Sequence, residues 1–157
     1  MSRDSIIVAH ANLSADKLDN VALLPEIAMN LSYWCVLVAG IMPVATVGIA
    51  KWSGRRDYDN SEPRRWLEKQ SGIPRRADSA HRNHFEAFPF FAAGVLVAQQ
   101  LHAPQDSIDM LAIAFIASRI AYTGLYLTDR ATLRTVSWLI GYLAVIGLFL
   151  IAPGQGS

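Results

Sequence analysis

The stretch AHRNHFEAFPFFAAGVLVAQQL, residues 80–101, decides the fold class. Its second half is apolar enough to lie in lipid, whereas its first half places charged and amide side chains on the same predicted helix. Charged side chains next to an apolar, membrane-spanning segment need water, a partner helix or a ligand, because an unpaired charge in the membrane interior costs about 2.5–3.5 kcal/mol on insertion scales. The stretch therefore predicts a membrane protein with a polar site near one boundary.

The composition also favours a membrane class. Of the 157 residues, 52% are hydrophobic and 17% are charged. The apolar residues gather in long blocks, whereas a soluble bundle would show amphipathic stripes. The single cysteine, Cys35, lies inside the first apolar block. Because the chain has one cysteine, an intrachain disulfide and a metal site built on several thiolates are excluded.

The blocks predict one all-α domain, an integral membrane bundle of four transmembrane helices in residues 27–152. The expected helices are at about residues 27–52, 76–101, 108–127 and 133–152. Pro43 predicts a kink in the first helix, and the second tolerates Pro89 because membrane helices accommodate proline. Residues 1–26 are expected to be an extension outside the membrane, without signal-peptide features, and residues 153–157 a tail.

The polar loop, residues 53–75, is expected to hold a short interfacial helix. We expect this helix to start near Ser61 and to end at Gly72, with Trp66 and Leu67 facing the bilayer.

Basic residues concentrate around this loop. Nine of the fourteen fall between positions 51 and 82: Lys51, Arg55, Arg56, Arg64, Arg65, Lys69, Arg75, Arg76 and Arg82. Five acids are interleaved with them and the flanks are apolar, so a membrane-flanking loop is favoured over a nucleic-acid surface. The turn TDRATLR, residues 128–134, is basic too. The positive-inside rule then predicts a cytoplasmic loop, with both termini on the non-cytoplasmic side of what we expect to be a bacterial inner membrane.

The polar half of residues 80–101 carries one candidate set of site residues. Arg82, Asn83 and Glu86 share one broad helix face, because residues three and four apart are neighbours. Two simpler interpretations stay open: Arg82 and His84 extend to the interface, or Arg82 and Glu86 form a local ion pair. His81 and His84 are three apart but lack further ligands nearby, so we expect no metal site.

The third block carries the other candidates. Arg119, Tyr122 and Tyr126 lie on one stripe, and Arg134 returns to the same end of the bundle. A buried arginine needs a carboxylate, which predicts an ion pair between Arg119 and Glu86, either in a ligand site or as a purely structural link between helices. Guanidinium groups, an asparagine and a glutamate suit a small zwitterion that carries carboxylates.

Three segments resemble the MAPEG family, the membrane-associated proteins in eicosanoid and glutathione metabolism, and in particular its bacterial branch. They are YDNSEPR, RRADSAHRNHFEAFPFFAAGVLVA and SRIAYTGLYLTDRATLR, residues 58–64, 75–98 and 118–134. The most specific feature is Asn-x-x-Glu-x-x-Pro at Asn83, Glu86 and Pro89, followed by the later Arg/Tyr/Tyr/Arg series. The resemblance extends over about residues 27–152.

The resemblance implies a homotrimer of four-helix subunits that binds glutathione between subunits near the cytoplasmic face. The counterparts of Asn83, Glu86, Arg119, Tyr122 and Tyr126 help to bind the peptide, and that of Arg134 stabilises its thiolate. A guanidinium favours a thiolate, since a free thiol titrates near pH 8.5. The expected partners are membrane lipids, a lipophilic small-molecule substrate and a larger membrane complex.

Two positions depart from the family pattern. Ser79 stands where well-characterised glutathione-using members have an arginine, with Arg76 one further turn back. Ala87 stands where some members have a tyrosine. The first hypothesis is therefore a glutathione transferase or peroxidase that acts on lipophilic electrophiles. The alternative is a non-catalytic trimer, a structural or lipid-binding subunit of a larger assembly; a transporter is disfavoured because broken helix pairs are lacking.

Overall fold

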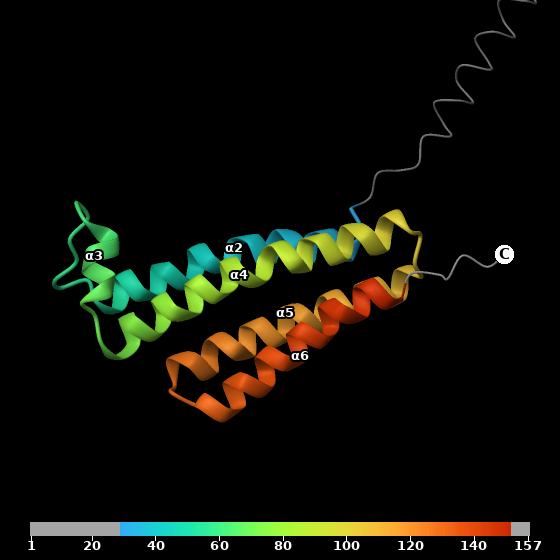
Figure 1. Ribbon diagram of the computed structural model, residues 1–157. Helices are drawn as coiled ribbons and strands as arrows, with labels where there is room; N and C mark the ends of the chain where they lie inside the picture. Colours follow the sequence, from blue (N-terminus) through green and yellow to red (C-terminus); the bar gives the residue numbers. More distant parts are fainter. Residues whose placement is uncertain (1–28, 152–157) are drawn as a thin grey trace, which may run out of the picture.

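The computed structural model describes residues 29–151, which form four long antiparallel helices and one short one (Figure 1). They are α2 (Leu31–Ser53), α3 (Pro63–Glu68), α4 (Gly72–Gln100), α5 (Gln105–Leu127) and α6 (Ala131–Leu150). In Figure 1, α2 lies beside α4 and α5 beside α6, with α3 at the end where α2 finishes and α4 begins. The α5–α6 turn lies toward this end, which we call the α3 end, and the α4–α5 turn lies at the other.

The long helices form close to the predicted positions, so the all-α fold is confirmed. The expected extension, the predicted start of the first helix at residue 27 and the tail lie outside the described residues. Within the described part, α4 begins at Gly72 instead of 76 and α5 at Gln105 instead of 108. Pro74 fits the first turn of α4, where the backbone N–H groups have no partner within the helix.

Small side chains let α2 pack closely on its neighbours. Its buried residues recur every three or four positions and are mostly small: Ser32, Cys35, Ala39, Pro43, Thr46 and Ala50. Large apolar side chains cover the opposite face, among them Trp34, Ile41 and Val44, which are 50%, 55% and 64% exposed. Close contact through small residues, with bulky residues outward, is typical of helices packed in lipid.

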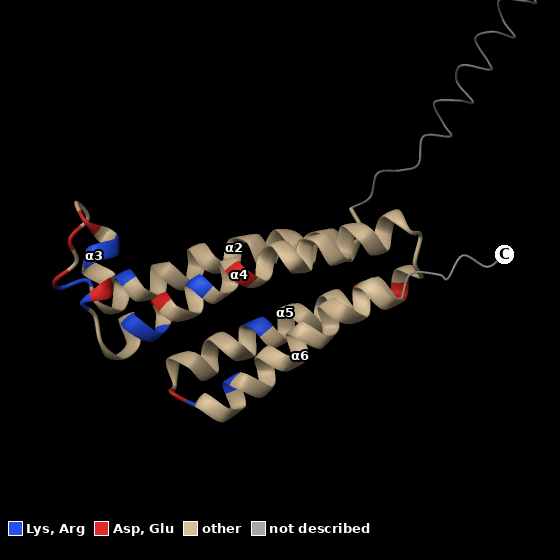
Figure 2. Ribbon diagram, viewed as in Figure 1, with Lys and Arg blue, Asp and Glu red and all other residues tan. Residues whose placement is uncertain are grey.

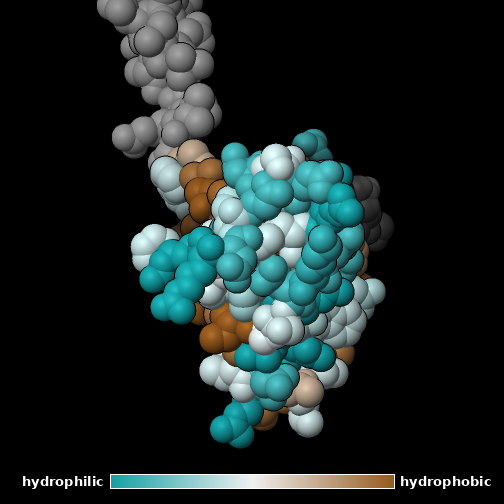
Figure 3. All heavy atoms as spheres, turned by 90° about the vertical axis from the view of Figure 1, so that its left-hand side faces the viewer, coloured by the Kyte–Doolittle hydropathy of each residue, from teal (hydrophilic) through white to brown (hydrophobic). Residues whose placement is uncertain are grey.

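Three helices in the described part of the chain, α2, α5 and α6, are long and apolar enough to cross a membrane. The fourth long helix, α4, extends over 29 residues but starts with polar turns. Lys and Arg gather in the half of the molecule that carries α3 (Figure 2). Seen from the α3 end, hydrophilic side chains cover most of the surface, and smaller hydrophobic patches appear between them and near the edges (Figure 3). The surface at the α3 end of the bundle is therefore mostly hydrophilic.

The loop helix α3 does not lie as expected. Trp66 and Leu67 are only 8% and 6% exposed, because they pack inward on Ala50 and Ala77 and do not face the bilayer. The α2 terminus admits this contact only because residue 54 is glycine: a Cβ there would lie 2.5 Å from Trp66 Cη2. Gly72, expected to end the helix, instead opens α4, with a φ of +62° that favours glycine.

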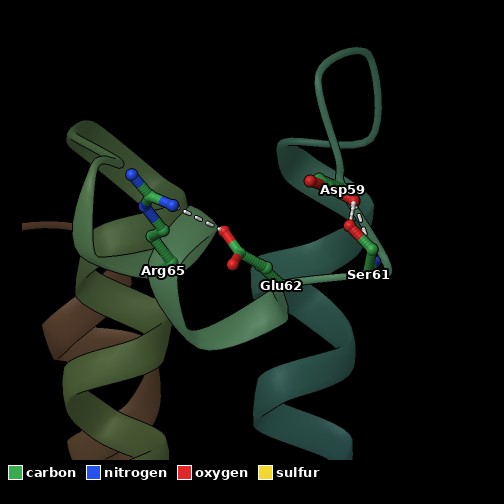
Figure 4. A network of polar contacts seen from close by, with 4 residues as sticks. All are labelled: Asp59, Ser61, Glu62 and Arg65. Atoms are coloured by element: carbon green, nitrogen blue, oxygen red, sulfur yellow. Dashed lines mark hydrogen bonds and ion pairs between the residues drawn. The ribbon is translucent and has the colours of Figure 1, made fainter.

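Local polar contacts shape the loop before α3 (Figure 4). The hydroxyl and backbone N–H of Ser61 donate to Asp59 Oδ1 over 2.6 Å and 2.8 Å. These hydrogen bonds lower the pKa of the Asp59 carboxyl, chiefly through the hydroxyl. Arg65 pairs with Glu62 at 3.0 Å on the solvent side of α3.

A polar network that the sequence analysis missed joins α2, α4 and α5 at the other end of the bundle. Asp109 Oδ1 accepts from the Ser32 backbone N–H over 2.9 Å and from Gln105 over 2.8 Å. Gln99 Nε2 donates to Ser32 Oγ over 3.0 Å and to Gln105 Oε1 over 3.1 Å. Asp109 thus satisfies a backbone N–H at the start of α2 that has no partner within that helix.

Candidate functional site

Aromatic and guanidinium groups of α5 and α6 form a continuous series toward the α3 end. The Arg119 guanidinium lies 4.5 Å from the centre of the Tyr122 ring, and that ring meets Tyr126 edge to face at 5.5 Å. The half-buried Arg134, on α6, places its guanidinium 4.2 Å from the Tyr126 ring centre. The predicted stripe on α5 and the approach of Arg134 to it are both present in the structure.

The predicted ion pair between Arg119 and Glu86 is wrong. Both terminal nitrogens of Arg119 donate instead to Asn83 Oδ1, over 3.1 Å and 3.2 Å. The Asn83 amide nitrogen then donates to Glu86 Oε2 over 3.2 Å. Because an amide carries both an acceptor and donors, Asn83 can join the cation to the carboxylate. Glu86 itself is exposed on α4.

The Arg119 guanidinium is buried with little compensation. The residue is only 3% exposed, and its Nε has no hydrogen-bond partner among the described residues. The Tyr122 ring and the Phe115 ring, whose centre is 5.8 Å away, provide cation–π contacts. Within the described part of the chain Arg119 forms no ion pair. A buried cation without a direct carboxylate partner favours an anion nearby.

A cavity of about 160 Å³ opens beside Arg119, between α4, α5 and α6. Its lining comprises Asn83, Glu86, Ala87, Phe90, Phe115, Arg119, Trp138, Tyr142 and Val145. Trp138 and Tyr142 stack at 5.2 Å, and Phe90 contacts Tyr142 at 5.7 Å. The cavity therefore has a charged and amide end and an aromatic wall. This wall was not predicted from the sequence, although Trp138 and Tyr142 are four residues apart on one face of α6.

The other predicted arginines are engaged elsewhere. Arg82 is half exposed and pairs with the buried Asp78 at 3.0 Å, so the alternative of a local pair with Glu86 is wrong. Arg76 Nε donates to the Leu127 carbonyl over 3.1 Å and thereby caps the end of α5. Ser79 donates back to the carbonyl four residues earlier, over 3.1 Å. None of these three side chains lines the cavity.

Two histidines of α4 hold neighbouring helices. Thr123 Oγ1 donates to the Arg119 carbonyl over 3.0 Å and lies 2.8 Å from His84 Nε2, which therefore acts as the donor to it. His81 Nδ1 lies 2.7 Å from the Pro43 carbonyl, on α2, and donates to it. His84 is buried and does not extend to the interface, which corrects that alternative.

A continuous series of contacts thus joins six of the eight predicted residues: Asn83, Glu86, Arg119, Tyr122, Tyr126 and Arg134. Of these, Asn83, Glu86 and Arg119 line the cavity. Arg119 and Arg134 outweigh the single carboxylate of Glu86, so this set has a net positive charge that favours an anionic ligand. The partly exposed Arg134 and the exposed Glu86 are accessible to a ligand, whereas Arg119 acts mainly through Asn83.

Residues 31–153 of the chain match the model of the MAPEG family. No curated protein and no solved structure matches the chain. The match and the three apolar helices together identify an integral membrane protein.

Proposed function

Because the chain belongs to the MAPEG family, which includes glutathione transferases and peroxidases as well as non-catalytic members, we propose that it binds glutathione at the α3 end and transfers it to lipophilic electrophiles or uses it to reduce peroxides. The observation that carries this proposal is the unbroken series of contacts from Arg134 on α6, through the tyrosines of α5, to Asn83 and Glu86 on α4. The arginines of this series can bind carboxylates and a thiolate, and its glutamate can bind an amine.

Arg134 is the residue that we assign to the thiolate. Its guanidinium stacks on Tyr126 and forms no ion pair with the residues that the structure describes. A close guanidinium stabilises the thiolate and so lowers the pKa of a bound thiol. The thiolate would then attack the electrophile, because the anion is the nucleophilic form.

Glu86 and Asn83 are assigned to the peptide. The exposed Glu86 carboxylate can accept hydrogen bonds from an ammonium group, and the positive charge of Arg119 lies one side chain away. The rings of Tyr122 and Tyr126 lie between these two residues and Arg134. We assign Arg82 and Arg76 no contact with the peptide, since their guanidinium groups are bound to Asp78 and to the Leu127 carbonyl.

A second copy of the chain would complete the site. The cavity in one subunit, about 160 Å³, is smaller than the roughly 300–1,000 Å³ of most ligand pockets. Large apolar residues on the outer face of α6 are exposed, among them Leu139, Ile140 and Leu143 at 47%, 51% and 55%. We propose that these faces meet lipid and neighbouring subunits in a homotrimer, with the peptide held between subunits.

We further propose that α4 crosses the membrane as the fourth span, with its polar turns at the cytoplasmic boundary. The nine basic residues between positions 51 and 82 support this side for the α3 end, and both termini would lie on the opposite side. The location that we propose in a bacterial cell is therefore the inner membrane.

The test of the proposed function is a conjugation assay on the purified protein in detergent, with glutathione and a chlorinated nitrobenzene. We expect glutathione-dependent product that falls about a hundredfold in Arg134→Ala, the size typical for loss of one electrostatic contact to a reacting anion. Arg130→Ala, which removes an equal charge from the same turn, is the matched control and should retain activity. Equal losses in both variants would contradict the role of Arg134.

One observation favours the non-catalytic alternative. The position of the family arginine holds Ser79, whose hydroxyl is used within α4, and the nearby arginines are bound elsewhere. Under this alternative the trimer serves as a lipid-binding or structural subunit. It predicts no conjugation and no reduction of lipid hydroperoxides by the wild-type protein, together with phospholipid or a partner protein that remains bound through purification.

A further inference from the structure

A second recess, of about 410 Å³, lies at the α3 end, apart from the candidate site. It is formed by the end of α2 with the turn that follows, by Gln70 after α3, and by Pro74 in the first turn of α4. Arg55 and Arg56 supply its cations, and Asp57 is the one carboxylate in its lining. None of these residues contributes to the site assigned to glutathione.

The recess lies at the level expected for lipid headgroups. With 23 residues and a rise of about 1.5 Å each, α2 is about 34 Å long, slightly more than the roughly 30 Å hydrocarbon core. Trp52, in its last turn, is 71% exposed. The Arg55 guanidinium lies 4.7 Å from the centre of the Trp52 ring and donates to the Trp52 carbonyl over 3.2 Å. Exposed tryptophan beside arginine is typical of a membrane–water boundary.

The charges in the recess lack acidic partners. Arg65, Arg76 and Arg82 each pair with a carboxylate, whereas Arg55 and Arg56 form no ion pair with any described residue. Guanidinium groups bind phosphate oxygens through paired hydrogen bonds. Two of them against one carboxylate leave the recess with a net charge that suits a singly charged phosphodiester.

The recess also offers a neutral hydrogen-bonding side chain, Gln70, which follows the docked helix α3. Gln70 Nε2 donates to the Trp66 carbonyl over 3.2 Å, which leaves its amide oxygen free to accept from a headgroup hydroxyl. The Trp66 indole packs against Gly54 and meets the Tyr58 ring edge to face, with the ring centres 5.0 Å apart. The docking of α3 therefore fixes the position of Gln70 relative to the turn that carries the arginines.

We propose that this recess binds the headgroup of an anionic phospholipid, with Arg55 and Arg56 on the phosphodiester and Trp52 beside the acyl-chain boundary. A lipid is favoured over free phosphate because the recess adjoins the end of a membrane-spanning helix, so its ligand is already concentrated in the bilayer. The bound lipid would connect α2 to the loop and to α4, and its site is independent of the proposed glutathione chemistry.

The test is native mass spectrometry of the full chain in detergent with added phosphatidylglycerol. We expect phosphatidylglycerol to remain bound to the wild type, and binding to weaken roughly thirtyfold in Arg55→Gln/Arg56→Gln, given the usual contribution of each basic residue to anionic-lipid binding. The matched control is Arg64→Gln/Arg130→Gln, which removes two exposed charges from the same end but none from the lining of the recess, and it should lose clearly less affinity than Arg55→Gln/Arg56→Gln.

Three results would overturn the proposal. Equal loss in the control variant would show that only the general positive field attracts the lipid. Equal retention of phosphatidylcholine would show that the anionic headgroup is not recognised. Full displacement of phosphatidylglycerol by inorganic phosphate would assign the recess to a free anion. If the double Gln variant does not fold, Arg55→Lys/Arg56→Lys replaces it, and its loss of the paired hydrogen bonds should still weaken binding measurably.

Discussion

At the scale of single residues, Asn83 is the centre of the candidate site. A carboxylate was expected opposite Arg119, yet the amide occupies that position and passes the contact on to Glu86. The two side chains of α4 therefore have different roles. Asn83 accepts from both terminal nitrogens of the buried guanidinium, and Glu86 stays exposed and available to a ligand.

This arrangement predicts unequal effects of two substitutions on stability. Asn83→Ala removes both hydrogen bonds from a buried cation and should lower the free energy of unfolding by about 1.5–3 kcal/mol. Glu86→Gln should cost less, because the new amide oxygen still accepts from Asn83. Thermal unfolding of both variants in one detergent measures the difference. A larger loss for Glu86→Gln would contradict the bridging role of Asn83.

Arg134 and Tyr126 show what the sequence could predict at this scale. Their approach across the α5–α6 turn followed from helix spacing and chain order, and the structure confirms it. The partners of Arg82 and Arg76 could not be predicted from the sequence. An arginine on a helix can reach side chains on the turn before it and on the turn after it, and also the carbonyls at the end of a neighbouring helix. Only the packed bundle decides between them.

At the scale of elements, the long helices were predictable and the short one was not. Apolar blocks bounded by polar turns fix the positions of α2, α5 and α6 to within a few residues. The six residues of α3 contain both charged and apolar side chains, so their sequence alone fits the bilayer surface and the protein core equally well. Gly54 determines that α3 packs on the protein core, because the absence of a side chain at this position leaves room for Trp66.

The docking of α3 predicts a contrast between two glycines of the α2 region. Gly54→Ala places a Cβ 2.5 Å from Trp66 Cη2, so α3 must shift and its loop should be cleaved faster by trypsin. Gly48→Ala meets nothing within 4 Å and should leave cleavage unchanged, with a gain in helix stability of up to about 1 kcal/mol. Limited proteolysis of the two variants checks the contrast. Identical cleavage rates would exclude Gly54 as the contact that holds α3.

The α5–α6 seam supplies a second element-scale prediction. A Cβ on Gly141 would collide with Ser118 Oγ, which itself donates to the Phe115 carbonyl over 2.7 Å. Gly141→Ala should therefore lower the melting temperature, whereas Gly124→Ala, which meets nothing within 4 Å on α5, should not. Both melting curves are measured under the same conditions. Gly141→Ala as stable as the wild type would argue against close packing at this seam.

At the scale of the whole molecule, the separation of charge along the bundle predicts its placement in the membrane. The polar α3 end carries the loop and the α5–α6 turn, and the α4–α5 turn lies at the opposite end (Figures 1 and 2). The antiparallel order of α4, α5 and α6 followed from their short connections. The three-dimensional lining of the cavity could not be predicted in the same way, because the aromatic wall comes from helices whose rotation only packing determines.

Single cysteines test this placement. In a Cys35→Ser background, Asn60→Cys and Thr132→Cys should react with a membrane-impermeant maleimide from the cytoplasmic side, and Gln100→Cys from the opposite side. Labelling in sealed vesicles of both orientations distinguishes the two sides of the membrane. Labelling of positions 60 and 132 from different sides would contradict the bundle topology, and a complete reversal would contradict only the assigned sidedness.

The most direct test of the central claim is a pH titration of the ultraviolet thiolate absorbance of glutathione bound to the purified protein. We predict a saturable thiolate signal with a pKa below the roughly 8.5 of a free thiol. In Arg134→Ala the pKa of the bound thiol should return toward that value, because the variant lacks the guanidinium that favours the anion, whereas Arg130→Ala should leave it unchanged. No saturable signal in the wild type, or a signal that Arg134→Ala leaves intact, would contradict the claim that Arg134 stabilises a glutathione thiolate.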